Sequence, residues 1–193
     1  MKPKILIING HPDDQSFCAA LSEAYKEGAA GREASVQNID LGRIDFTPIL
    51  KFGYRRRTEL EPALLEAQKL IRWADHLVFI YPTWWGTMPA LLKGFLDRIL
   101  LSGFAFKYRD NSSLWDKLLK GKTARLIVTT DTPSWYNWLV YKRAGHNVMK
   151  NNILRFCGVN PVKITEVGPL RSSSEKQRGK WLADVRRLGE RLA

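Results

Sequence analysis

Residues 76–90 read HLVFIYPTWWGTMPA, and this stretch decides the fold. The run from Leu77 to Tyr81 is continuously apolar, which is typical of a parallel strand buried on both faces of a sheet. Pro89 suits the first turn of a helix, and apolar residues follow it at helical spacing. The stretch therefore predicts a strand, a connection with two tryptophans, and a helix. In an open α/β sheet, ligands bind where such a connection leaves the carboxyl end of a strand.

Four further strands are predicted around this unit. They lie at residues 4–8, 34–40, 123–130 and 162–167. Helix patterns alternate with them, at residues 17–27, 58–74 and 146–156 and after the last strand. This alternation predicts an α/β fold with a doubly wound five-stranded parallel sheet and helices on both faces. One domain over residues 1–193 accommodates it.

Two helix starts are predicted from residues at capping-box spacing. Thr58 with Glu61 opens one helix, and Ser172 with Glu175 opens the last. Residues 41–57 contain two glycines and a proline without a clear period, so they indicate a long loop. Long irregular loops in compact domains are often functional.

The charge favours anionic partners without choosing among them. Lys and Arg total 31 against 19 Asp and Glu, a formal charge of +12. Such a charge suits a nucleotide cofactor, a nucleic acid or an acidic membrane surface. The clusters 55–57 and 186–187 fit no motif that reads nucleic acid and indicate a solvated basic face, so no nucleic-acid partner is expected.

Neither a metal site nor a membrane span is expected. Cys18 and Cys157 form no C-x-x-C pair, and the three histidines show no ligand spacing. No apolar stretch approaches the roughly 20 residues of a transmembrane helix, and the first residues lack the apolar region of a secretory signal. The expected location is cytoplasmic.

The turn after the first strand is a candidate anion site. Residues 9–18 read NGHPDDQSFC and join strand one to helix one, whose free amides attract a phosphate. His11 and Ser16 add possible donors. The turn lacks the glycines of a dinucleotide fingerprint and the lysine of a P-loop, and the alternative is that Asp13, Asp14 or Ser16 only caps the helix.

Trp84 and Trp85 admit two interpretations. Two large indoles on a connection can close a hydrophobic core. Their position at the carboxyl end of a strand instead favours a flat aromatic ligand.

Three motifs resemble one family. They are His11-Pro-x-x-x-Ser16-Phe17, Tyr81-Pro-x-Trp-Trp-Gly-x-x-Pro-Ala-x-Leu-Lys-Gly-Phe-x-Asp-Arg98 and Ile153-Leu-x-Phe-Cys-Gly158. In this order they are similar to the NAD(P)H:quinone oxidoreductases, which have a flavodoxin-like fold. The resemblance implies a flavin at the carboxyl ends of strands one, three and four.

The resemblance also implies which residues bind the flavin. The phosphate turn comprises His11, Ser16, Phe17 and Cys18. The segment along the isoalloxazine ring, which donates backbone amides to its pyrimidine edge, comprises Pro82, Thr83, Trp84, Trp85 and Gly86. The loop at the other edge of the ring comprises Thr129, Thr130 and Asp131. The family often has a glycine pair after the two threonines, where this chain has Asp131 and Thr132.

A tyrosine and a histidine form a charge relay in the larger members of the family. His146 matches the histidine. In the family the tyrosine lies six residues before the histidine. Tyr141 lies five residues before His146 and Tyr136 ten, so Tyr141 is favoured and Tyr136 is the alternative. His146 can also be read as a residue that only caps or packs a helix.

The function implied is two-electron reduction of quinones or similar flat acceptors by a ping-pong cycle, with NADPH or NADH as the co-substrate. A homodimer with each active site at the subunit interface is implied too. Larger members hold FAD through a C-terminal extension, whereas one phosphate turn suffices for FMN, so FMN is favoured and FAD is possible. Candidate aromatic residues for the acceptor slot are Trp84, Trp85, Phe104, Phe106, Tyr108 and Trp135.

Two other functions stay open. One is a regulatory subunit of a potassium efflux system, because ancillary proteins of such systems are similar to this family and a basic surface suits a membrane transporter. The other is a flavodoxin-type electron carrier. Such carriers usually have an acidic surface, so the charge of +12 counts against that function.

Overall fold

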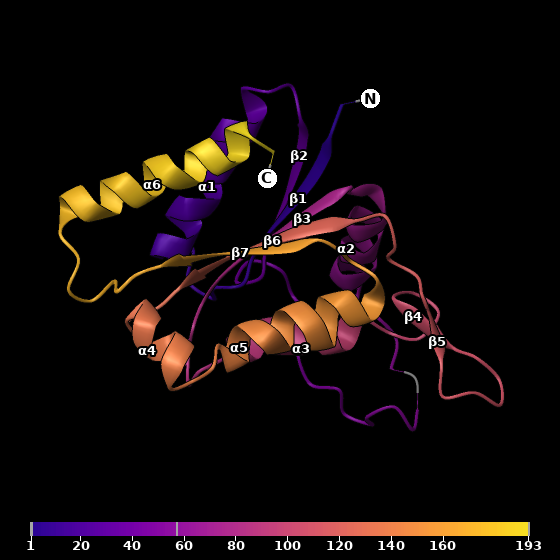
Figure 1. The fold of residues 1–193 in the computed structure, drawn as a ribbon. Helices are drawn as coiled ribbons and strands as arrows, with labels where there is room; N and C mark the ends of the chain where they lie inside the picture. The colour runs from indigo at the N-terminus through magenta and orange to yellow at the C-terminus, as the bar shows by residue number, and fades with distance from the viewer. Residues whose placement is uncertain (1, 57, 193) are drawn as a thin grey trace.

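A parallel sheet forms the centre of the protein in the computed structural model, which describes residues 2–56 and 58–192. Its strands are β1 (Lys4–Asn9), β2 (Ser35–Asp40), β3 (His76–Pro82), β6 (Thr123–Thr129) and β7 (Val162–Val167). They lie in the order β2-β1-β3-β6-β7, and every neighbouring pair is parallel (Figure 1). The chain leaves β1 toward one edge of the sheet and leaves β3 toward the other. This confirms the predicted doubly wound sheet and places a switch point between β1 and β3.

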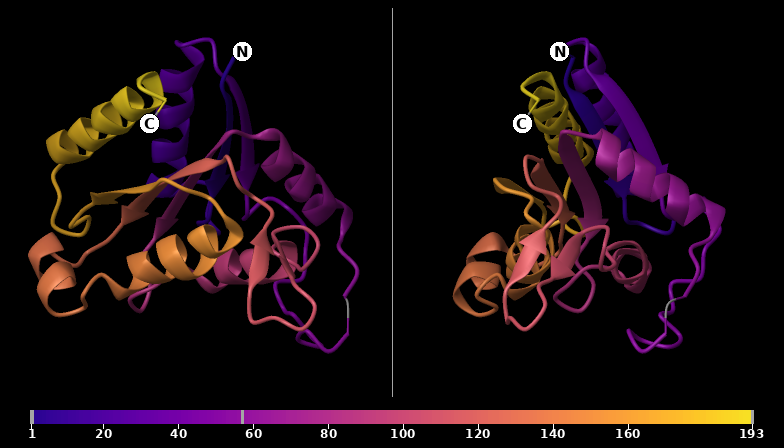
Figure 2. Two further views of the ribbon diagram at one scale, coloured as in Figure 1. Left: turned by 45° about the vertical axis from the view of Figure 1, so that its right-hand side comes forward. Right: turned by 90° about the vertical axis from the view of Figure 1, so that its right-hand side faces the viewer.

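Helices cover both faces of the sheet, as Figures 1 and 2 show. On one face lie α1 (Phe17–Ala30) and α6 (Glu175–Glu190), and on the other lie α2 (Pro62–Trp73), α3 (Ala90–Ile99) and η1 (Val148–Arg155). Successive residues of β1 alternate between these faces: Ile5 and Ile7 pack with α1, and Leu6 and Ile8 with the opposite layer. All four are fully buried.

Several short elements were not predicted. An antiparallel hairpin joins β4 (Phe106–Tyr108) to β5 (Trp115–Lys117), and α4 (Ser134–Leu139) follows β6. Strands of three residues carry no usable period in a sequence. The helix predicted over residues 146–156 is divided into α5 (Ala144–Asn147) and the π-helical η1.

Both predicted capping boxes were wrong. The last helix begins after Ser174, whose hydroxyl accepts a hydrogen bond from the Gln177 amide, so the cap is two residues later than Ser172. Helix α2 begins at Pro62 without a side-chain cap. The carboxylate of Glu61 binds the Arg98 guanidinium instead, because Arg98 is buried and needs a charged partner.

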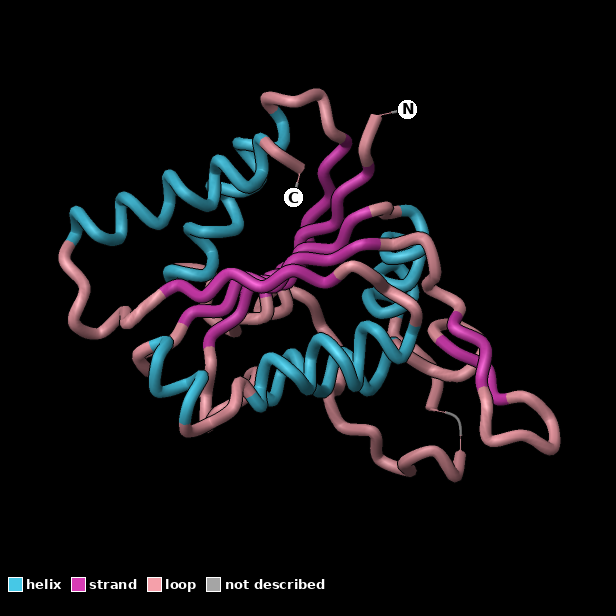
Figure 3. Tube along the Cα trace, in the orientation of Figure 1, coloured by secondary structure: helices cyan, strands magenta, loops and turns pink. Residues whose placement is uncertain are grey.

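The predicted loop contains no helix or strand in its described residues, 41–56, and is drawn pink in Figure 3. Arg98 of α3 attaches it to the domain. Its guanidinium donates to the carbonyls of Thr47 and Glu59 and to both carboxylate oxygens of Glu61, at 3.1 and 2.7 Å. One cation thus holds two segments of irregular chain.

No described helix is suited to span a membrane. None of them combines the length and the apolar composition that crossing a bilayer requires.

Replacing Arg98 tests this attachment. We expect Arg98→Met to lower the free energy of unfolding by about 3 kcal/mol, because two carbonyls lose their donor and the Glu61 carboxylate keeps only the Thr47 amide. Arg32→Met, at an exposed position after α1, is the control and should change it by less than about 0.5 kcal/mol. Chemical denaturation measures both values. Equal effects of the two substitutions would contradict the attachment.

Candidate functional site

Two adjoining cavities lie at the carboxyl ends of β1, β3 and β6. The large cavity has a volume of about 580 Å³ and the small cavity about 200 Å³, and both are lined by Thr83, Thr130 and Asp131. The small cavity is also lined by His11, Ser16, Phe17, Cys18, Pro82, Trp84 and Thr129. The large cavity is also lined by Trp85, Gly86, Tyr141 and His146. The folded chain therefore gathers the predicted flavin-binding residues, with Tyr141 and His146, around two adjoining cavities.

The turn after β1 presents the start of α1 to the small cavity. Ser16 is the N-cap, and its hydroxyl accepts a hydrogen bond from the Ala19 amide at 3.3 Å. The ring of His11 accepts one from the Asp13 amide at 3.0 Å and meets the Trp84 indole edge-on at 5.5 Å. The first amides of a helix have no partner within it, so this end of the hollow suits an anion.

Cys18 is at the base of the small cavity. It is buried, and its sulfur lies 3.5 Å from the Thr129 hydroxyl. Burial raises the pKa of its thiol to about 11, and the hydrogen bond with Thr129 only partly opposes this. A protonated thiol at neutral pH is a poor nucleophile, so Cys18 serves as a wall.

The two tryptophans belong to a tight turn. Trp84 and Thr87 exchange backbone hydrogen bonds of 2.8 and 3.1 Å, while Trp85 and Gly86, with φ of +50° and +78°, form the tip. Trp85 is 102% exposed and Trp84 44%, so the core interpretation fails. The Thr83 amide is already bonded to the Thr129 carbonyl. Among the described residues, the Trp85 and Gly86 amides have no backbone partner, so they are the free donors at this edge.

A close backbone contact joins this turn to α5. A Cβ atom on Gly145 would lie 2.2 Å from the Gly86 carbonyl oxygen, so only glycine permits the approach. The next residue is His146. The contact therefore brings the imidazole into the large cavity beside the tip of the turn.

His146 is buried beside a carboxylate. Its Nδ1 lies 3.1 Å from Glu166 Oε1, an oxygen that also accepts a hydrogen bond from Asn137 at 3.0 Å. Burial lowers the pKa of the imidazole; Glu166 opposes this effect and the Arg143 guanidinium adds to it. The lowered pKa favours the neutral imidazole at pH 7, and Nδ1 makes no hydrogen bond among the described residues despite its nearness to Glu166.

Tyrosines complete the large cavity. Tyr141 lines it, while Tyr136 stacks edge-on against Tyr141 at 5.1 Å and is not among the lining residues. Tyr81 also lines it from β3, and its buried hydroxyl has no hydrogen-bond partner in the described part of the chain. Burial raises the pKa of that hydroxyl, so it stays protonated. A buried donor without a partner is costly unless a ligand accepts its hydrogen bond.

The loop after β6 is closed by side chains where the family often has glycines. The Thr130 hydroxyl accepts a hydrogen bond from the Thr132 amide at 3.0 Å. The Asp131 carboxylate accepts one from the Arg171 amide at 2.7 Å. These two hydrogen bonds hold the loop, and its residues Thr130 and Asp131 line both cavities.

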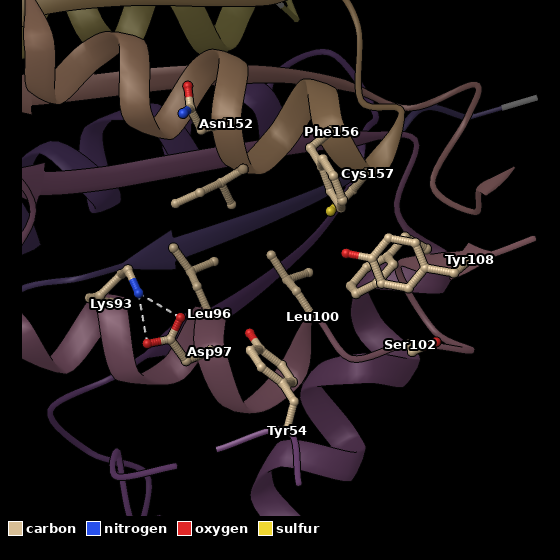
Figure 4. A pocket seen from close by; sticks show the side chains of 12 residues that line it. Tyr54, Lys93, Leu96, Asp97, Leu100, Ser102, Tyr108, Asn152, Phe156 and Cys157 are labelled. Carbon is tan, nitrogen blue, oxygen red and sulfur yellow. Dashed lines mark hydrogen bonds and ion pairs between the residues drawn. The ribbon is translucent and has the colours of Figure 1, made fainter. Parts of the chain in front are cut away.

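Four of the predicted slot aromatics lie elsewhere. Phe104 is buried in the core, and Trp135 lines neither cavity. Phe106 and Tyr108 line a separate hollow of about 560 Å³, here called the α3–η1 groove, at the opposite end of the helical layer from α4. Figure 4 shows this groove between the two helices, with the Lys93–Asp97 ion pair at one end and Tyr108 at the other.

Sequence reasoning missed three residues of the large cavity and its surroundings. Asn137 and Glu166 come from α4 and β7, and their pairing with His146 depends on folding. Tyr81 was read only as the end of a buried strand. A carboxylate near the carboxyl end of a predicted strand, as at Glu166, was a usable signal, because burying it requires a polar partner.

The titration of His146 tests this arrangement. We expect its midpoint below 6.5, a further decrease in Glu166→Gln, which removes the opposing charge, and an increase in Arg143→Gln. Arg155→Gln, at the far end of η1, should leave it unchanged. Proton NMR resolves the midpoints, because the chain has three histidines. A midpoint indifferent to both Glu166 and Arg143 would refute the described electrostatics.

Comparisons with known proteins agree with this geometry. The model of the Flavodoxin_2 family, described as a flavodoxin-like fold, matches residues 3–192. The rat ribosyldihydronicotinamide dehydrogenase [quinone] is 29% identical over 216 residues, which span 96% of this chain and 90% of that protein. An uncharacterized NAD(P)H oxidoreductase of Haemophilus influenzae is 28% identical, over 90% of this chain and 87% of its own.

A solved structure extends the likeness to the whole chain. The NAD(P)H:quinone oxidoreductase from Methanothermobacter marburgensis is 27% identical, with a TM-score of 0.85, over 100% of this chain and 98% of that one. A family match over nearly every residue and a shared fold lead to the same conclusion. The chain belongs to the Flavodoxin_2 family of flavodoxin-like proteins, among the relatives named NAD(P)H:quinone oxidoreductases.

Proposed function

We propose that this protein is a flavin-dependent NAD(P)H oxidoreductase that reduces quinones or similar flat aromatic acceptors by two electrons. One observation carries the proposal. Two adjoining cavities, which share Thr83, Thr130 and Asp131, lie between the start of α1 and the free amides of Trp85 and Gly86. The printed names of the relatives, which include quinone dehydrogenases, agree with it.

The residues present fit a flavin. Its phosphate would bind the amides at the start of α1 beside His11 and Ser16, since that end of the hollow suits an anion. Its flat ring would lie along the Trp84–Gly86 turn, whose free amides would donate to the polar edge. The unpartnered Tyr81 hydroxyl supports a polar ligand in the large cavity. FMN is favoured over FAD, because one phosphate turn meets its needs.

A bound flavin would supply the redox chemistry, by accepting a hydride from NADPH or NADH and passing two electrons to the acceptor. The chain supplies orientation, exclusion of water and proton transfer. Trp84 and Trp85 offer flat surfaces against which aromatic rings stack. Tyr141 and His146 would move the proton that accompanies reduction, and the Glu166 carboxylate, 3.1 Å from Nδ1, would favour the proton on that nitrogen and leave Nε2 as an acceptor.

Reconstitution and turnover test this function. We expect the protein to retain FMN and to oxidise NADPH or NADH only when a quinone is present in an anaerobic assay. The flavin released by denaturation should have the mass of FMN. Protein that is colourless after incubation with both FMN and FAD would refute the proposal.

Trp84→Ala sharpens this test. We expect it to weaken flavin binding about tenfold, because a stacking surface is lost, while thermal unfolding of the apoprotein changes little at a half-exposed site. Trp138→Ala is the matched control, since Trp138 is an exposed tryptophan outside both cavities. A variant that loses stability but keeps its flavin affinity would show that Trp84 stabilises the fold and does not bind the flavin.

We also propose a homodimer that forms through the α3–η1 groove. The groove is lined mainly by apolar side chains, including Leu96, Leu100, Phe106, Ile153 and Phe156. Its charged residues Lys93 and Asp97 neutralise each other at 2.6 Å. An open apolar groove with a neutralised charge pair suits association with a second copy.

Tyr108→Asp tests the homodimer. Tyr108 is exposed at the end of the groove, so the substitution places a charge in the interface without disturbing the core. We expect the dimer dissociation constant to rise at least about tenfold in sedimentation equilibrium. Leu65→Asp, on the exposed side of α2, is the control. An unchanged constant would place the interface elsewhere.

A further inference from the structure

The helix α4 has an unusual surface for its position. All of its residues are described and none is buried, although Trp135, Trp138 and Leu139 are apolar. These three side chains are 64%, 61% and 61% exposed, and Val140 and Tyr141 continue the surface at 49% each. Contiguous exposed apolar residues of this size mark a binding surface in a soluble domain.

The helix is anchored so that this surface faces outward. Asn137 donates to Glu166 at 3.0 Å and lines the large cavity, which fixes the inner side of α4. Trp135, Trp138 and Leu139 are spaced at i, i+3 and i+4 and therefore share a face. Figures 1 and 2 show α4 at the periphery of the molecule, beyond the ends of β6 and β7.

Two basic residues border this surface. Lys142 and Arg143 follow it directly, both are exposed, and no ion pair involves them within the described residues. Their position is fixed, because the Arg143 amide donates to the Asn137 carbonyl at 2.9 Å and the Lys142 carbonyl accepts from Asn147 at 3.0 Å. Both have positive φ, +48° and +53°, a strained conformation that typically persists where it has a use.

We infer that α4 docks the protein on an anionic lipid surface. Indole rings prefer the boundary between headgroups and acyl chains, where Trp135, Trp138 and Leu139 would insert. Lys142 and Arg143 would contact the headgroups, and the formal charge of +12 attracts the whole protein to such a surface. A second copy is a poorer occupant, because residues 134–143 contain no acidic residue, so a second α4 surface would offer Lys142 and Arg143 no carboxylate.

Docking would give the site a source of apolar substrate, and this consequence rests on the proposed function. Asn137 and Tyr141 belong to the docking segment and also line the large cavity. A protein held by α4 would therefore open its cavity toward the bilayer. Quinones with long hydrocarbon tails partition into the bilayer, so they would reach the site without crossing water.

Vesicle binding tests the docking. The FMN-loaded protein is mixed with vesicles of equal parts phosphatidylcholine and phosphatidylglycerol, or of phosphatidylcholine alone, and binding is followed by flotation at low and high salt. We expect binding to the anionic vesicles at low salt and little to the others. Trp138→Ser with Leu139→Ser should weaken it about tenfold, and Lys142→Glu with Arg143→Glu at least as much.

Matched controls separate α4 from the rest of the surface. Ile49→Ser with Leu65→Ser removes exposed apolar side chains elsewhere, and Lys176→Glu with Lys180→Glu makes the same change of charge on α6. Both should retain most of the binding. The inference fails if the unmodified protein ignores anionic vesicles, or if the α4 variants bind as the controls do. It also fails if the Trp138 and Leu139 variant lowers the mass in sedimentation equilibrium, since α4 would then contact a second copy.

Turnover is measured separately with a short-chain, water-soluble quinone and no vesicles. Vesicle binding without such turnover would support docking and refute the oxidoreductase function. Turnover without vesicle binding would support the oxidoreductase function and refute docking.

Discussion

The divergence of the chain between β1 and β3 is the constraint on which the rest of this structure depends. The two strands are parallel, so the connections that follow them leave from the same end of the sheet. One connection turns to α1 and the other to α3, on opposite faces of the sheet. The two cavities lie between these connections, at the carboxyl ends of the strands.

The site accepts local costs that a purely structural region would avoid. Trp85 is fully exposed at positive φ, the buried Tyr81 hydroxyl has no hydrogen-bond partner among residues 2–56 and 58–192, and His146 is buried beside a carboxylate. Each feature lowers stability by itself. Their concentration around one hollow is what a ligand site requires, because a ligand covers the indole and satisfies the donor.

Different parts of the protein were predictable to different degrees. Continuous apolar runs such as 77–81 predict buried parallel strands, because a strand covered on both faces needs an apolar side chain at every position. Capping boxes were unreliable, since Glu61 could bind either a helix start or Arg98, and burial of Arg98 decided between them. The position of Glu166 near a strand end indicated a polar partner, but the sequence did not show that this partner is His146, because the two residues lie on different elements.

The sequence by itself determined the α/β alternation, the family resemblance and the set of residues near the strand ends. Tertiary structure decided how those residues are used. Gly145 packs against the Gly86 carbonyl and so delivers His146 to the cavity, while hydrogen bonds consume the amides of Thr83 and Trp84 and leave those of Trp85 and Gly86 free. The physical reason is range: strand and helix patterns arise from neighbours in the chain, whereas burial, pairing and free donors depend on contacts between distant segments.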